Sequence, residues 1–121
     1  MPAREAPQPP YILLFEEAAS GAEPLVISVD DRPALPLFDS PYLFYDLYCL
    51  LPGQAQKVHA HQNSDKIYYV LSGTGRFTVG DEKQDLPERH AVIARAGEPH
   101  GVSNETGENL VLLITMAPRP S

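Results

Sequence analysis

From residue 41 onward, short apolar runs alternate with turn residues along the chain. Runs rich in Val, Ile, Tyr, Phe and Leu recur about every eight to twelve positions, and Gly, Pro, Asn, Asp or Ser closes each of them. The strands expected from this pattern cover residues 42–51, 57–61, 66–71, 76–79, 90–95 and 110–116. None of these segments shows a sustained helical period, and many short strands are typical of a sandwich or a barrel. The pattern therefore predicts an all-β fold.

The first 40 residues have a different composition, because eight of the thirteen prolines lie at or before position 41. Within this part of the chain, residues 11–15 fit an edge strand and residues 13–20 fit a short helical turn equally well. The expected organisation is a Pro-rich N-terminal arm with one or two edge strands (1–40), a compact barrel (41–117) and a tail (118–121).

Composition narrows the classes of function. The 121 residues suffice for one domain, and 43% of them are hydrophobic. No stretch reaches the roughly 20 apolar residues that span a bilayer, and the N-terminus lacks an apolar signal core, so we expect a cytoplasmic protein without a membrane partner. Nine Lys and Arg are scattered among sixteen Asp and Glu, without the basic stripe that nucleic-acid binding needs. The single Cys49 excludes an intrachain disulfide and is expected to be a small buried residue.

Three of the four histidines occupy positions that suit a metal site. His59 and His61 are two apart in an expected strand, so alternation places both on one face. His100 follows a Gly-Glu-Pro turn at the end of a later strand, where it can be aimed back into a barrel. Imidazole binds transition metals, here Zn, Fe, Ni, Mn or Cu. On spacing alone, surface histidines are an equally valid interpretation, and His90 is expected to be exposed in a loop.

Two motifs around these histidines resemble those of the cupin family. In the first family motif a Gly, a His-x-His pair, a downstream Glu and a closing Gly follow in order. The matching positions here are Gly53, His59, His61 and Gly73. In the second motif a Gly stands three residues before a His and an Asn four after it, as do Gly97, His100 and Asn104.

This resemblance covers roughly residues 40–117, and it implies a particular fold and site. The fold it implies is a double-stranded β-helix (jelly-roll) cupin barrel, here with an N-terminal Pro-rich arm. The metal ligands it implies are His59, His61 and His100. Small cupins of this kind are expected to form homodimers, and residues 11–15 are a plausible strand to add to a neighbour's sheet edge.

The chain departs from the family pattern at the fourth ligand. Counting back from the closing glycine, Lys66 stands where the family usually has Glu, with Asp65 beside it. A protonated lysine has no lone pair and repels a divalent cation. Three interpretations remain open: a three-histidine site in which Lys66 swings away or binds an anionic ligand, a register shift that lets Asp65 replace the Glu, or a pocket that binds a small molecule without metal.

The expected chemistry follows from which side chains face inward. If Lys66 points inward, alternation places Tyr68 on the same face. Lys66 then suits a clamp for a substrate carboxylate, and Tyr68 a hydrogen-bond donor or general acid. The alternatives are a solvated Lys66 and a Tyr68 that only packs. We expect a metal-dependent enzyme of the isomerase, dioxygenase or sugar-acid-processing type, acting on a small oxygen-rich substrate. A non-catalytic module that binds or senses a small molecule is the alternative.

Overall fold

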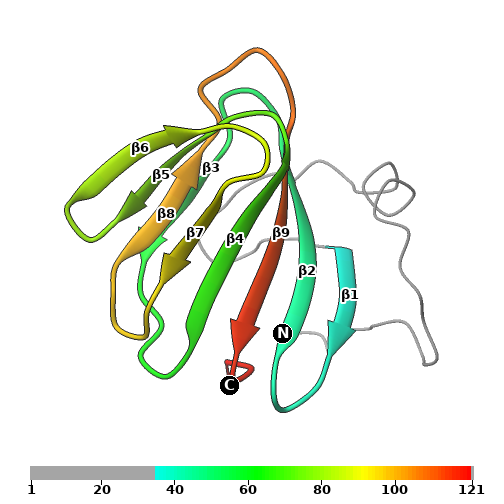
Figure 1. The fold of residues 1–121 in the computed structure, drawn as a ribbon, viewed down its shortest axis with the longest axis vertical. Helices are drawn as coiled ribbons and strands as arrows, with labels where there is room; N and C mark the ends of the chain where they lie inside the picture. Colours follow the sequence, from blue (N-terminus) through cyan, green and yellow to red (C-terminus); the bar gives the residue numbers. More distant parts are fainter. Residues whose placement is uncertain (1–34, 121) are drawn as a thin grey trace.

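The computed structural model describes residues 35–120, which form two antiparallel sheets that enclose one core (Figure 1). The strands are β1 (Leu35–Asp39), β2 (Phe44–Leu50), β3 (Ala55–His59), β4 (Asp65–Ser72), β5 (Gly75–Val79), β6 (Glu82–Leu86), β7 (Ala91–Ala94), β8 (His100–Ser103) and β9 (Leu110–Ala117). The larger sheet has the order β1-β2-β9-β4-β7 and the smaller one the order β3-β8-β5-β6. No helix occurs within the described residues. The predicted all-β jelly-roll fold is confirmed.

The core lies between the sheets because the strands alternate apolar side chains toward it. The larger sheet contributes side chains from β2, β4 and β9, and the smaller sheet contributes Phe77 from β5 and Val102 from β8. On the opposite face of the larger sheet, a second apolar cluster is formed by Leu37, Leu47 and Leu113. Cys49 is buried as predicted.

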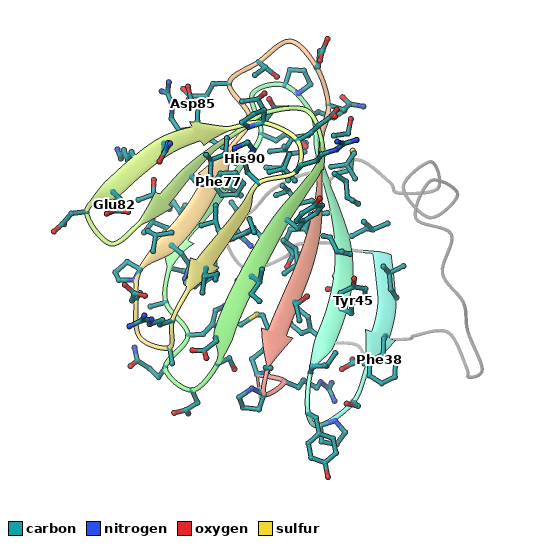
Figure 2. The ribbon with its side chains drawn as sticks, viewed as in Figure 1. Phe38, Tyr45, Phe77, Glu82, Asp85 and His90 are labelled. Carbon is teal, nitrogen blue, oxygen red and sulfur yellow. The ribbon has the colours of Figure 1, made fainter. Side chains whose placement is uncertain are left out.

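Two strands were not expected from the sequence. β6 consists almost entirely of exposed polar residues, and Glu82 and Asp85 project from it at the edge of the smaller sheet (Figure 2). An exposed edge strand of this kind lacks the apolar alternation that predicts strands. β8 has only four residues and contains Gly101, so its pattern is too short to be recognised.

The N-terminal segment is described only in part. β1 falls within the expected arm and forms an edge of the larger sheet, next to β2. The expected strand at 11–15 and the helical turn at 13–20 lie outside the described residues. The homodimer that was linked to residues 11–15 stays a prediction. Within the described part of the chain, no helix is long and apolar enough to cross a membrane.

Candidate metal centre

Three imidazole rings meet at one end of the smaller sheet. His59 is the last residue of β3 and is paired in the ladder with His100, the first residue of β8. The sequence pattern predicted that His61 lies in a strand. In the structure β3 ends at His59, and His61 lies two residues beyond it. Its ring is nevertheless 4.8 Å from that of His59 and 5.6 Å from that of His100, measured between centroids. One ligand atom from each histidine lies within 4.8 Å of those of the other two.

Backbone carbonyls orient two of these rings. The Nδ1 of His59 lies 2.7 Å from the carbonyl oxygen of Lys57, and the Nδ1 of His100 lies 2.9 Å from that of Glu98. A carbonyl oxygen can only accept, so each Nδ1 carries a proton, and in the neutral ring the Nε2 then keeps a lone pair that can bind a metal ion. This arrangement is usual for metal-binding histidines, whose second ring nitrogen is held by a partner.

The spacing of the ring nitrogens also fits a metal ion. The Nε2 atoms of His59 and His61 are 3.1 Å apart. Two nitrogens bound at about 2.0–2.1 Å to a tetrahedral ion are roughly 3.3 Å apart. His59 and His61 are partly exposed whereas His100 is 2% exposed, so the position between the rings is reached from the surface side. Together, the three residues fit a divalent transition metal.

A β-bulge in β3 produces this arrangement. The register between β3 and β8 shifts between Gln56 and His59. Strict alternation would turn these two side chains to opposite faces, but the bulge turns both inward and leaves Val58 54% exposed. The bulge passes close to Gly101: a Cβ there would lie 2.9 Å from the carbonyl oxygen of Gln56 and 3.0 Å from the nitrogen of Val58. Only glycine leaves room for this strand path.

Lys66 lies inside the barrel. Its side chain is 1% exposed, and its Nζ lies 3.4 Å from the Oε1 of Gln56. The Nζ also faces the rings of Tyr68 and Tyr48, at 4.8 Å and 5.8 Å from their centroids. The interpretation of Lys66 as a solvated surface lysine is therefore wrong.

Asp65 does not replace the missing glutamate. Its carboxylate is exposed and accepts a hydrogen bond of 2.9 Å from the backbone nitrogen of Ala96. The pairing of β4 with β9 is regular from Asp65 to Val70, and the irregularity comes only after Val70. Without a register shift at this point, Asp65 and Lys66 face opposite sides, and the substitution hypothesis is wrong.

Tyr68 links the polar and apolar parts of the interior. It is fully buried, and its hydroxyl donates a hydrogen bond to the Oε1 of Gln56. Its ring packs edge-on against His100, at 6.1 Å between centroids, and against Phe77, at 5.4 Å. Figure 2 shows Phe77 between the two sheets. The packing role and the polar role that the sequence left as alternatives therefore coexist.

Two buried polar residues on the strands were missed by sequence reasoning. Gln56 is 2% exposed, and only the bulge turns it inward, which no local pattern signals. Asp46 is 1% exposed on β2, where it pairs with Ile114 of β9, which pairs in turn with Tyr68. The sequence does contain an indication that Asp46 is buried, because it is the only charged residue in the apolar run of β2.

Asn104, the last residue of the second motif, has a structural role. Asn104 is fully buried, and its Nδ2 donates to the carbonyl oxygens of Leu50, at 2.9 Å, and of Glu108, at 2.7 Å. It thereby ties the turn after β8 to the end of β2. His90 is exposed, as predicted, and its Nδ1 lies 3.0 Å from the carbonyl oxygen of Glu88.

Comparison with known proteins agrees with this fold. The family model described as "Cupin domain" matches residues 46–116. The crystal structure of TT1209 from Thermus thermophilus is 51% identical, with a TM-score of 0.70, over 73% of this chain and 84% of that one. The structure of BH2720 from Bacillus halodurans has a TM-score of 0.79 at 19% identity, over 91% of this chain and 82% of that one, and shows the shared fold alone.

One curated relative also matches. The uncharacterized protein MJ1618 from Methanocaldococcus jannaschii is 29% identical over 66 residues, which are 54% of this chain and 53% of that protein. The matched region thus spans about half the length of each.

Proposed function

Because the chain belongs to the cupin family, and because three of its imidazole rings converge, we propose that it is a small metal-dependent cupin enzyme acting on a small oxygen-rich molecule. The observation that carries this proposal is the convergence of the ligand nitrogens of His59, His61 and His100 within 4.8 Å of one another. These residues would hold Zn, Fe, Ni, Mn or Cu. Three protein ligands leave further positions for water or substrate, which a catalytic metal requires.

The bound ion would supply Lewis acidity, while the side chains deeper in the barrel bind and orient the substrate. The interior holds the ammonium of Lys66 and the carboxyl group of Asp46, and of the two Lys66 would be the one to hold an anionic group of the substrate. The ring of Tyr68 packs against His100, and its hydroxyl donates a hydrogen bond to Gln56 in the same interior. We assign both residues to substrate binding.

A second function is favoured by one specific observation. No carboxylate stands at the fourth ligand position, because Lys66 occupies it and Asp65 bonds to Ala96 outside the barrel. A site with three neutral ligands binds metal less tightly than one that includes an anion. A non-catalytic module that binds or senses a small anion is the alternative function.

Turnover distinguishes the two functions. The metal-loaded protein is incubated with hydroxy acids, oxo acids, diketones and sugar acids, and products are followed by proton NMR. Product formation that is lost in the His59→Ala/His61→Ala double variant supports the enzyme. Ligand line broadening without product supports the binding module. Neither product nor binding across the panel contradicts both.

A further inference from the structure

The outer face of the larger sheet, which points away from the core, carries an apolar cluster of its own. The pairing of β2 with β9 is regular, and it sets Leu47 opposite Leu113 on this face. Cys49, two residues further along β2, shares the face by alternation. Further apolar side chains of the cluster are Leu37, Tyr45, Tyr69, Leu71 and Val111. An antiparallel sheet that covers a core with one face usually turns polar side chains to solvent on the other.

The burial of this face is uneven. Leu47 is 1% exposed, Leu37 3% and Cys49 5%, all on β1 and β2. At the other side of the same face, Ile67 of β4 and Ile93 of β7 pair with each other and are 39% and 61% exposed. Side chains stand roughly perpendicular to a sheet, so neighbours in the sheet shield their sides and leave their outer ends open. The nearly complete burial of Leu47 therefore indicates a covering layer that ends before Ile67.

Two ionisable side chains of the same face agree with this cover. Burial raises the pKa of the Tyr45 hydroxyl and the pKa of the Cys49 thiol. Desolvation disfavours the charged forms of both groups. Water is therefore kept from a part of the sheet surface that would be wet if the face were open.

The part of the chain before Leu35 lies outside the described residues, but its sequence contains a segment of matching chemistry. Its longest apolar run is Tyr-Ile-Leu-Leu-Phe at residues 11–15. Residues 16–34 connect this run to β1, which forms an edge of the larger sheet. Fully extended, a connection of this length spans about 60 Å, whereas three neighbouring strands are only about 10 Å across. The run can therefore reach any point of the face.

We propose that residues 11–15 pack on the outer face of the larger sheet of their own chain, over Leu37, Leu47 and Leu113. Each chain then covers its own apolar cluster without a second copy. The exposed Ile67 and Ile93 stay outside the covered area. The competing arrangement is an arm that binds to a neighbouring chain. The interface is separate from the three histidines, two of which pair within the smaller sheet, so it holds with or without a bound metal.

Cys49 provides a probe of this cover, because it is the only cysteine of the chain. Its rate of alkylation by iodoacetamide is compared between the full-length wild type and the Leu13→Ser/Leu14→Ser variant. The variant loses two apolar contacts of the cover, so Cys49 should react at least about tenfold faster. Equal rates in the two proteins would overturn the proposal.

Leu25→Ser/Ile27→Ser is the matched control, because it makes the same change in the same part of the chain but outside the run. It should keep the alkylation rate of the wild type. If this control accelerates Cys49 and the Leu13→Ser/Leu14→Ser variant does not, another segment forms the cover and the proposal is wrong.

A mixed sample distinguishes a cover from the same chain from one supplied by a neighbour. Wild type and the Leu13→Ser/Leu14→Ser variant are unfolded, mixed in equal amounts and refolded together, and mass spectrometry follows the alkylation of each chain separately. Each chain should keep the rate that it has alone. Acceleration in about half of the wild-type chains would show exchange between copies and overturn the proposal.

Limited proteolysis tests the wild type without any substitution, and it decides the question if the variants do not fold. Chymotrypsin cleaves after tyrosine and phenylalanine, which begin and end the run at residues 11–15. Cleavage there should be at least about tenfold slower than in a free peptide of residues 8–18, because a packed segment must first open locally. Equal rates in the protein and the peptide would overturn the proposal.

Discussion

His59 and His100 face each other across the ladder between β3 and β8, with ring centroids 4.5 Å apart. Each ring is held at its Nδ1 by a backbone carbonyl two residues earlier in the chain. The two ligands are therefore oriented by the strands themselves. A metal ion that binds between them needs little rearrangement of these rings, which favours affinity.

Gly101 should be essential for this orientation. Replacing it with alanine puts a Cβ 2.9 Å from the carbonyl oxygen of Gln56, which pushes the bulge of β3 outward and moves His59. We expect a loss of about 1–3 kcal/mol in the free energy of unfolding, together with weaker zinc binding. Chemical denaturation and chelator competition measure the two effects.

Gly107→Ala is the matched control, because a Cβ at Gly107 meets no atom within 4 Å. That variant should keep both the stability and the zinc affinity of the wild type. Equal zinc affinity in Gly101→Ala and Gly107→Ala would show that the bulge does not position His59.

The charge at position 66 should control metal affinity. Lys66→Glu replaces a buried cation with the carboxylate that the family pattern has at this position. We expect zinc affinity to rise at least tenfold, because repulsion is removed and an anionic ligand is added. Lys66→Met, which removes the charge without adding a ligand, should lie between Lys66→Glu and the wild type. If all three proteins compete equally with a chelator, Lys66 does not act on the metal site.

Cys49 should react slowly in the folded protein. It is 5% exposed on β2, and burial raises the pKa of its thiol. The thiolate is the reactive form, so both its low abundance and its inaccessibility slow alkylation. Iodoacetamide at pH 8 should modify Cys49 far faster in 6 M guanidinium chloride than in buffer. Similar rates in the two conditions would place the thiol at an open surface.

The fold was largely predictable because short stretches of the sequence carry the patterns that indicate strands and turns. Alternation and turn residues located six of the strands, and the motif spacing located His59, His61 and His100. The interior polar residues depend instead on tertiary contacts. Gln56 faces inward because a bulge fits against Gly101, 45 positions away in the sequence.

Tertiary contacts also decide which of Asp65 and Lys66 faces inward. Sequence reasoning left the two as alternatives for the interior, because either can begin the inward face of β4. Their orientation is decided by the register with β9 and by the bond from Ala96 to Asp65, across 31 positions of the sequence. Neither contact has a local signature.

The most direct test of the metal centre is elemental analysis of the purified protein, without a His-tag, beside the His59→Ala/His61→Ala variant. The geometry predicts about one equivalent of a transition metal in the wild type and none in the variant, because two of three ligands are removed. The same metal content in both proteins, or none in the wild type after incubation with Zn, Fe, Ni, Mn and Cu, would contradict the three-histidine site.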